Sequence, residues 1–549
     1  MDNMTNLQII NPNSNDNEKH QHYLSFRKRI ILLNWLMKIV NLYRLRCHTF
    51  QLAVLIMDKF LLKEQHVIDT LNIQAVGLIC LGLASKVEEV IPLGLKDYMN
   101  ICNESYSQSF LIKLECRVLR KLCYCLYNNT IWQYVKLYAA QRKISSENFY
   151  LAYFLSNITL LSNEYLQYSS QQIAQAIINT CIILNTEPES LQFIIENEPE
   201  YEFIYNNWKN ITLNYPESVE IFSSELKLVN LSIIPPDIKL SNIKSLKINN
   251  ENNLPIGTNN YLYKKEIMNN IEIFQKLGAG AYGSVHHIKY NNKNIAMKVI
   301  KTSKKDISPL VLREINNMML LNHPNVLKLD GFLYDSKQTT MYIGLELMQM
   351  SLTHKIVHEN LSETQKSVYI MQLLEGLCHI HSSGIMHRDL CGNNVLISHN
   401  DTIKISDFGM SRYYCNSIFT TAYSGNICSI YYRPIELFLN VHPYTEKIDV
   451  WSCACVIGLI LTGSDLFMGN DEKDVLLNIY KTLGTPNKYF FKSVNKTMTK
   501  IFYPKTGFID LEDKYPGHSK ILYQMLEYDP DKRLTIFQAT EMFKQLLNY

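Results

Sequence analysis

The sequence predicts a multidomain protein in which an all-α helical bundle is followed by a domain with a small strand-rich lobe and a larger helical lobe. Three observations predict this. The 549 residues exceed what one hydrophobic core usually serves, so two or three domains are expected. In the first half, apolar residues recur at helical spacing, and alternating strand patterns are nearly absent. From Ile271 the pattern becomes strand-rich, and after Leu352 it is mostly helical.

The helical pattern is most regular from Ile31 to Tyr43, where apolar residues at three- and four-residue steps form the stripe of a buried helix. The same spacing predicts helices over Phe50–Leu62, Ile73–Glu88, Ser107–Leu122, Ile131–Ala140, Phe149–Leu161 and Ser170–Leu184. In the second half, strands are expected over Ile271–Leu277, Ser284–Tyr290, Asn294–Ile300, Val326–Leu333 and Met341–Leu347.

Composition shifts along the chain give the domain boundaries. The polar, Asn-rich start predicts a disordered tail, and a polar stretch that contains Pro235-Pro236 predicts a connector, because two prolines cannot continue a helix. The expected divisions are a tail at 1–20, a helical domain at 21–228 with two repeats at about 23–128 and 130–228, a linker at 229–270 and a second domain at 271–549.

Overall composition restricts the function classes. With 47% hydrophobic residues, 19% charged residues and a net charge of +3, nothing argues for binding to nucleic acid or to a membrane surface. The thirteen cysteines are scattered and no pair of Cys-x-x-Cys units occurs, which favours a reduced protein. The longest apolar run, Val450–Leu461, is too short to span a bilayer. An intracellular location, cytoplasmic or nuclear, is therefore expected.

The chemistry of the chain is concentrated in residues 387–394 and the acid that follows them. Asp389 and Asn394 lie five positions apart, and Asp407 follows thirteen residues later, after the strand-like run 402–405. Phosphoryl transfer needs one carboxylate that accepts a hydroxyl hydrogen bond, together with an amide oxygen and a second carboxylate that hold Mg²⁺. This spacing predicts Asp389 as catalytic base, Asn394 and Asp407 as metal ligands, and ATP with Mg²⁺ as cofactors.

Two further segments fit the same chemistry. Lys298 lies in an apolar strand and needs an anion, for which Glu314 and the α- and β-phosphates are candidates. Upstream, a glycine-rich run would let backbone N–H groups approach phosphate, although a tight β-turn could show the same pattern. This run consists of Leu277, Gly278, Ala279, Gly280, Ala281, Tyr282, Gly283, Ser284 and Val285.

These elements, in this order, resemble the eukaryotic protein kinases. The resemblance covers residues 271–546, and Ser308–Ile315 and Lys481–Pro486 are similar to segments of the cyclin-dependent kinases. It implies a two-lobed fold that transfers the ATP γ-phosphate to Ser or Thr of protein substrates, with Pro expected after the target. It also implies that Asp449 supports the catalytic loop and that Glu436 pairs with Arg533. Further nucleotide contacts expected from it are Ala296, Leu396 and the backbones of Glu346 and Met348.

Regulatory roles also follow from this resemblance. Ser424 aligns with the family's activating phosphosite, and Arg313, Arg388 and Arg412 match the arginines that hold its phosphate; the alternative is three separate surface arginines. Tyr282 matches an inhibitory phosphotyrosine of the family. These five regulatory assignments depend on the alignment alone.

Departures from the family point to a slower kinase. Cys391 stands where the family has a lysine that steadies the γ-phosphate, and Ser351 replaces a ribose-binding Asp. Cys391 is expected to lie beside the γ-phosphate, partly open to solvent, where positive surroundings would lower its pKa; the alternative is a buried, inert thiol.

The first half resembles the cyclins over roughly residues 23–187. The segments that carry this resemblance are Arg29–Leu36, Cys80–Glu89, Leu114–Leu119 and Leu151–Ala176. It implies that Lys86 and Glu115 contact the regulatory helix of a kinase; the alternative is an ordinary solvated charge pair. Asn34 replaces a family Asp but could still bond Arg29. The family's docking patch keeps Leu32 and Trp35 but has Lys28 and Lys38.

The two resemblances together predict a cyclin–kinase fusion whose cyclin-like half activates its own kinase half. Protein substrates and this intramolecular contact are the expected partners, with other cyclins or kinases as further candidates. The competing hypothesis is a weakly active or pseudokinase scaffold that binds and redirects other cell-cycle proteins. The presence of Lys298, Glu314, Asp389, Asn394 and Asp407 favours the enzyme.

Overall fold

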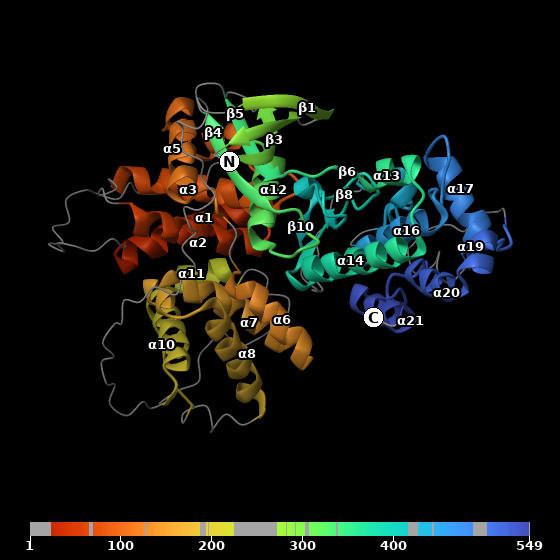
Figure 1. Ribbon diagram of the computed structural model, residues 1–549. Coiled ribbons are helices and arrows are strands. Elements are labelled where there is room, and N and C mark those ends of the chain that lie inside the picture. The colour runs from red at the N-terminus through yellow and green to blue at the C-terminus, as the bar shows by residue number, and fades with distance from the viewer. Residues whose placement is uncertain are drawn as a thin grey trace. The chain divides into compact units, whose positions relative to one another are not determined.

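In a computed structural model the chain forms two compact units, one helical and one built from strands and helices (Figure 1). The structure describes residues 24–64, 70–126, 129–186, 194–195, 197–223, 272–280, 283–290, 292–301, 307–335, 339–414, 427–441, 444–486 and 502–547. The predicted tail and the predicted linker lie outside these residues. The fold class is as predicted: a multidomain chain with a helical first part, then a sheet followed by helices.

The first unit is all-α over its described residues. Its helices are α1 (Phe26–Tyr43), α2 (Cys47–Lys63), α3 (Thr70–Glu88), α4 (Leu95–Ile101), α5 (Gln108–Lys121), α6 (Ile131–Arg142), α7 (Ser146–Ile158), α8 (Ser170–Thr186), α10 (Pro199–Asn214) and α11 (Pro216–Phe222). The seven predicted helices are confirmed. Three were not predicted, because α4 and α11 have only seven residues each and α10 mixes polar and apolar positions.

A buried ion pair ties α1 to α2. The Arg29 guanidinium donates to both carboxylate oxygens of Asp58, at 2.6 and 2.8 Å, and its Nε donates to the carbonyl of Leu160 at 2.9 Å. The hydrogen bond considered between Arg29 and Asn34 is absent from the described contacts, since Asn34 Nδ2 donates to Ser218 Oγ of α11 at 3.0 Å. Residues five positions apart point to different sides of a helix, which explains the separate partners.

Helix α11 packs along α1 in the region that resembles the cyclin docking patch. Lys38 pairs with Glu217 at 2.8 Å, next to the bond from Asn34 to Ser218. Leu32 and Trp35 are buried, with 6% and 7% of their surface exposed. The apolar side chains of this patch are therefore part of the core of the described unit, and a docking role for them is not supported by their exposure.

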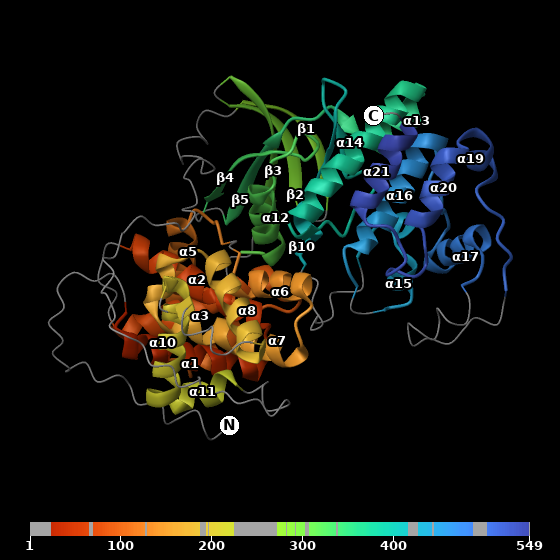
Figure 2. The ribbon, with the colours of Figure 1, turned by 90° about the horizontal axis from the view of Figure 1, so that it is seen from below.

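The second unit begins with a five-stranded antiparallel sheet of order β1-β2-β3-β5-β4, with helix α12 (Pro309–Leu320) against it (Figure 2). The strands are β1 (Glu272–Gly280), β2 (Gly283–Tyr290), β3 (Lys293–Lys301), β4 (Leu329–Asp335) and β5 (Thr340–Glu346). All five predicted strands are confirmed. The fourth starts at Leu329 and not at Val326, because Val326 forms a bridge with Ile405 outside this sheet.

The remainder of the second unit is mainly helical. Its elements are β6 (Met350–Ser351), α13 (Leu352–His358), α14 (Glu363–Ser382), β7 (Ile385–Met386), β8 (Val395–Ile397), β9 (Ile403–Ile405), η6 (Phe408–Met410), β10 (Arg412–Tyr413), η7 (Ile430–Tyr432), α15 (Ile435–Phe438), α16 (Lys447–Thr462), α17 (Glu472–Leu483), α19 (Ile509–Lys514), α20 (Pro516–Met525) and α21 (Ile536–Leu547). The apolar run at 450–461 is the buried helix α16. In the part of the chain that is described, no helix is long and apolar enough to cross a membrane.

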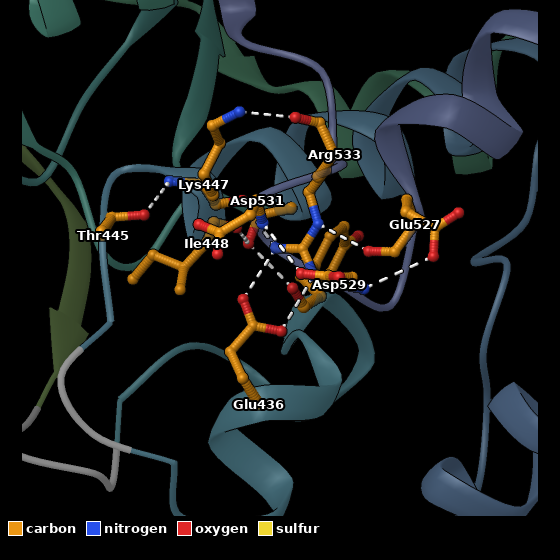
Figure 3. Close-up of polar contacts among 10 residues, drawn as sticks. Glu436, Thr445, Lys447, Ile448, Glu527, Asp529, Asp531 and Arg533 are labelled. Carbon is orange, nitrogen blue, oxygen red and sulfur yellow. Dashed lines mark hydrogen bonds and ion pairs between the residues drawn. The ribbon is translucent and has the colours of Figure 1, made fainter. Parts of the chain in front are cut away.

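Within the helical lobe, Arg533 forms the predicted ion pair with Glu436 of α15 (Figure 3). Its two terminal nitrogens donate to the carboxylate oxygens of Glu436 at 2.7 and 2.9 Å, and its Nε donates to the carbonyl of Glu527 at 2.9 Å. The guanidinium also lies 5.1 Å from the centre of the Trp451 ring. Both charged groups are only 1% exposed, so loss of either would leave an uncompensated buried charge.

A substitution in the first unit tests its packing. A Cβ at Gly82, in the middle of α3, would clash with the hydroxyl and ring of Tyr98. We expect Gly82→Ala to destabilise the protein by about 1–3 kcal/mol through overpacking, although Ala favours helix. Thermal or denaturant unfolding measures this loss. Adding Tyr98→Leu should reduce it, and strictly additive effects of the two substitutions would contradict the described contact.

Candidate active site

Lys298 on β3 forms the ion pair expected with Glu314 on α12. Its Nζ lies 2.6 and 2.8 Å from the two carboxylate oxygens of Glu314, and 3.8 Å from Oδ1 of Asp407. Burial raises the pKa of Glu314; the positive charge of Lys298 opposes this effect and the negative charge of Asp407 adds to it. One ammonium group therefore joins the strand, the helix and the acid that the sequence predicted as a metal ligand.

Asp389 is held by polar contacts on both carboxylate oxygens. The side-chain amide of Asn394 donates to its backbone oxygen at 2.8 Å and to Oδ2 at 3.2 Å. The N–H and hydroxyl of Ser429 donate to Oδ1 at 3.0 and 3.2 Å. The sequence analysis missed Ser429, because it lies 40 positions from Asp389 and carries no local pattern. These contacts fix the direction in which Asp389 can accept a further hydrogen bond.

The buried carboxylate of Asp449, on α16, fixes the backbone of this loop, as the kinase resemblance implied. It accepts hydrogen bonds from the N–H groups of His387 and Arg388, at 2.7 and 2.8 Å, and from Nε2 of His381 at 2.9 Å. Burial favours a higher pKa for Asp449, but the hydrogen bond and charge of His381 hold that pKa below its ordinary value. Arg388 has a φ of 71°, a strained value that these two N–H bonds maintain.

Asp407 lines a cleft that Lys298 and Asp389 also line. Its backbone is left-handed, with a φ of 63°, and its side chain is 45% exposed beside Lys298. The cleft has a volume of about 420 Å³ and is lined by Lys298, Glu314, Asp389, Asp407 and Ser429, among others. One carboxylate and one amide oxygen suit Mg²⁺ bound to phosphates, since Mg²⁺ usually takes few protein ligands there, and the lysine ammonium suits the phosphates themselves. The described residues contain no group of three His, Cys, Asp or Glu side chains that could hold a metal alone.

The glycine-rich segment joins β1 to β2. Gly278, Ala279 and Gly280 pair with Val285, Ser284 and Gly283, as in a hairpin. Gly283 has a φ of 147°, and a Cβ there would clash with the carbonyl oxygen of Val299, so only glycine fits. Ala281 and Tyr282 lie outside the described residues. The phosphate contacts of this segment, which include Leu277, remain predictions.

The predicted adenine contacts Glu346 and Met348 lie at the end of β5 and two residues beyond it. The N–H of Glu346 donates to the carbonyl of Lys328 at 3.2 Å, so only its carbonyl remains for a nucleotide. Leu396 lies on β8 opposite Ser351, and Ala296 is buried on β3. The Ser351 hydroxyl accepts from the N–H of His354 and caps α13, a role that its sequence position did not indicate. The nucleotide contacts of these residues and of Met348 remain predictions.

The three arginines of the predicted phosphate site are buried, not surface residues. Arg313, Arg388 and Arg412 are 4%, 1% and 7% exposed. Arg388 donates to the carbonyl of Met410 at 3.1 Å and to the hydroxyl of Tyr444 at 2.7 Å. The alternative of three exposed arginines is therefore wrong. Ser424 lies outside the described residues.

The expectation of a partly open, reactive Cys391 is wrong. Its side chain is 5% exposed and does not line the cleft. Burial raises the pKa of the thiol, and the nearby Asp389 carboxylate acts in the same direction. The loop is also closely packed at the next residue, where Gly392 accepts a hydrogen bond from the Thr353 N–H and a Cβ would clash with the side chains of Thr353 and Leu459.

In the first unit, Lys86 and Glu115 pair with each other at 2.7 Å. Their side chains are only 1% and 9% exposed, so the alternative of an ordinary solvated charge pair is wrong. A buried pair of this kind is costly to break, which favours a defined positional role.

A lysine–glutamate pair, a loop with Asp and Asn, and a following Asp at the same cleft, on a sheet lobe followed by a helical lobe, are typical of a protein kinase domain. Comparison with known protein families leads to the same assignment. The model for the protein kinase domain matches residues 271–544, and that for the cyclin N-terminal domain matches residues 1–127.

Individual relatives extend over both parts. Two proteins of Acanthamoeba polyphaga mimivirus, each named "Putative serine/threonine-protein kinase", are 36% and 34% identical over 536 and 537 residues; these cover 94% and 95% of this chain and 97% and 94% of the relatives. The rice protein named cyclin-dependent kinase G-2 is 30% identical over 289 residues, 49% of this chain and 40% of its own length. The chain therefore belongs to the protein kinase family and joins a cyclin domain to its kinase domain.

The corrected environment of Cys391 predicts low reactivity. We expect alkylation of the folded chain at neutral pH to modify the partly exposed Cys47 and Cys116 first, and Cys391 only after denaturation. Mass spectrometry of the labelled peptides measures this order. Modification of Cys391 as fast as that of Cys116 would show that the thiol is open after all.

Proposed function

We propose that this chain is a serine/threonine kinase of the cyclin-dependent type, which transfers the γ-phosphate of ATP to Ser or Thr of protein substrates. The observation that carries the proposal is the connected set around the cleft. Lys298 joins Glu314 to Asp407, while Asn394 and Ser429 hold Asp389. A scaffold that only binds other proteins would not need this complete set, so the enzyme is favoured over the pseudokinase alternative.

Each residue has a separate task in the proposed reaction. Asp389 accepts the hydrogen bond of the substrate hydroxyl, because a carboxylate keeps acceptor capacity beyond its bonds to Ser429 and Asn394. Lys298, oriented by Glu314, binds the α- and β-phosphates. Asn394 and Asp407 hold Mg²⁺, which neutralises charge on the phosphates when bound. The glycine-rich segment that ends at Gly283 covers the nucleotide.

A preference for Pro after the target is supported by the backbone of Cys428. This residue is left-handed, with a φ of 65°. Arg433 donates from Nη2 to the Cys428 carbonyl at 3.1 Å and from Nε to the Ile427 carbonyl at 3.0 Å, and its Nη1 pairs with Glu472 at 2.7 Å. A carbonyl held by Arg433 is not available to an N–H of the substrate. Proline lacks that N–H, whereas any other residue would leave it unpaired.

The kinase activity and the preference for Pro after the target can be measured together, with full-length protein, radiolabelled ATP and matched Ser-Pro and Ser-Ala peptides. We expect Mg²⁺-dependent transfer, abolished by Asp389→Asn, and faster transfer to the Ser-Pro peptide by about five- to a hundredfold, the effect of one unpaired donor. Transfer that persists in Asp389→Asn would remove the assigned base. Equal rates on the two peptides would contradict the proline preference alone.

Ser424 is the proposed activating phosphosite. Arg388 contacts the carbonyl of Met410 at the end of η6, Arg412 begins β10 two residues later, and Arg313 lies on α12, which packs against η6. A phosphate carries about −1.5 to −2 charge and would offset the three guanidinium charges.

We also propose that the cyclin domain activates the kinase domain of the same chain, with Lys86 and Glu115 directed at α12. The predicted linker of about 40 residues would reach at most roughly 130–145 Å. As a flexible coil, it would separate its ends by about 32–38 Å. Such a tether holds the domains at an effective concentration on the order of millimolar, so binding within one chain is favoured over recruitment of a separate cyclin.

Dilution tests this intramolecular activation. The specific activity of the full-length chain should stay constant over about a hundredfold dilution, because a tethered contact does not depend on protein concentration. Activity that falls steeply on dilution would indicate exchange between chains, as in a domain-swapped dimer. A Lys86→Ala chain should lose activity at every concentration; undiminished activity would remove Lys86 from the activating contact.

A further inference from the structure

A short chain of buried polar contacts connects α12 to the segment that carries Asp407. Asn317 donates from Nδ2 to Ser411 Oγ at 2.6 Å, and the Ser411 hydroxyl donates to the carbonyl of Phe408 at 2.5 Å. Asn317 and Ser411 are 1% and 0% exposed, and they are 94 positions apart in the sequence. The sequence analysis did not single out either residue.

The position of these contacts relates them to the active site. Asn317 follows Glu314 by three residues, which places the two side chains on neighbouring positions of the same helix face. Ser411 follows directly after η6, which begins one residue after Asp407. The polar chain therefore links the helix that carries Glu314 to the turn that carries Asp407. Neither Asn317 nor Ser411 lines the cleft, so they act on it only through their neighbours.

Stability alone does not account for an asparagine at this position. Ile315 and Met318 of the same helix are buried and apolar, and so is Phe408, whose carbonyl accepts the Ser411 hydrogen bond. Asn317 Oδ1 is buried and has no hydrogen-bond partner among the described residues, which costs stability that an apolar side chain would not. A buried polar group that is kept at such a cost is best explained by the specific geometry that it imposes.

We propose that Asn317 and Ser411 are positioning residues for phosphoryl transfer: their hydrogen bond fixes how far along its axis, and in which rotation, α12 lies against the Asp407 segment. Apolar packing is not directional and tolerates small shifts of a helix. A buried hydrogen bond weakens steeply as its distance and angle change. By holding α12 in place, the bond keeps the Glu314 carboxylate within reach of Lys298, and so orders the group that binds the α- and β-phosphates. This inference rests on the proposed kinase function.

Three full-length variants separate positioning from plain stability: Ser411→Ala, Asn317→Leu and the double variant. Ser519→Ala is the matched control, since the Ser519 hydroxyl donates to the carbonyl of Pro516 in α20, away from the site, and Ser519 is also buried, at 5% exposed. Ser411→Ala leaves the Asn317 amide without its acceptor and should lower the unfolding temperature. Asn317→Leu leaves the Ser411 hydroxyl its bond to Phe408 and should lower the unfolding temperature less. The double variant removes both polar groups and should recover the unfolding temperature.

The turnover number of the double variant should stay low although its unfolding temperature recovers. We expect kcat on the Ser-Pro peptide to be about three- to tenfold lower in all three variants, the effect of one hydrogen bond, and unchanged in Ser519→Ala. We also expect amide hydrogen exchange in residues 309–320 to be faster in the double variant than in the wild type, while exchange in α20 stays the same.

The proposal is overturned if the double variant shows the same turnover and the same hydrogen exchange in α12 as the wild type. It is also overturned if Ser519→Ala loses as much turnover as Ser411→Ala. If the wild-type chain transfers no phosphate, the proposed function fails, while the exchange measurement still decides whether Asn317 and Ser411 fix the position of α12.

Discussion

The buried carboxylate of Asp449 is the constraint on which the catalytic loop depends. It is fully buried, yet charged, and it accepts hydrogen bonds from two successive N–H groups, those of His387 and Arg388. Those bonds hold Arg388 in a left-handed conformation and so set the direction of the next residue, Asp389. An isolated buried charge would be costly, and His381 on α14 offsets that cost with a third hydrogen bond. Helix α16, which carries Asp449, thereby positions the proposed base.

The same loop is connected to the segment that carries Asp407, the proposed metal ligand. His387 donates from Nε2 to the carbonyl of Ser406, and its ring packs edge-on against Phe408, with 5.1 Å between ring centres. Phe408 in turn accepts the hydrogen bond of Ser411, which holds Asn317 of α12. A continuous set of buried contacts thus runs from Asp449 through the loop and the Asp407 segment to the helix of Glu314. The proposed base, metal ligands and phosphate-binding lysine are positioned by one network and not by independent loops.

Much of this could be predicted from the sequence, because it depends on local patterns. Period-two and helical spacings identified the strands and the longer helices, and the cost of a lysine in an apolar strand led directly to Glu314. Contacts between distant segments could not be predicted in this way. Ser429 reaches Asp389 from 40 positions away, and Asn317 reaches Ser411 from 94. Cys391 was placed wrongly because its burial depends on tertiary packing, which includes a contact of the thiol with the distant Ser429 and which no local pattern shows.

The most direct test of this account is the turnover number of Asp449→Asn, measured with ATP and a Ser-Pro peptide in full-length protein. An asparagine amide keeps one acceptor oxygen but turns an NH₂ group towards a backbone N–H, so at least one of the two loop bonds is lost. The account predicts that kcat falls by about tenfold or more, the effect of one buried donor left unpaired, while the Lys298–Glu314 pair still supports ATP binding. An unchanged kcat in Asp449→Asn would contradict the claim that this carboxylate positions Asp389.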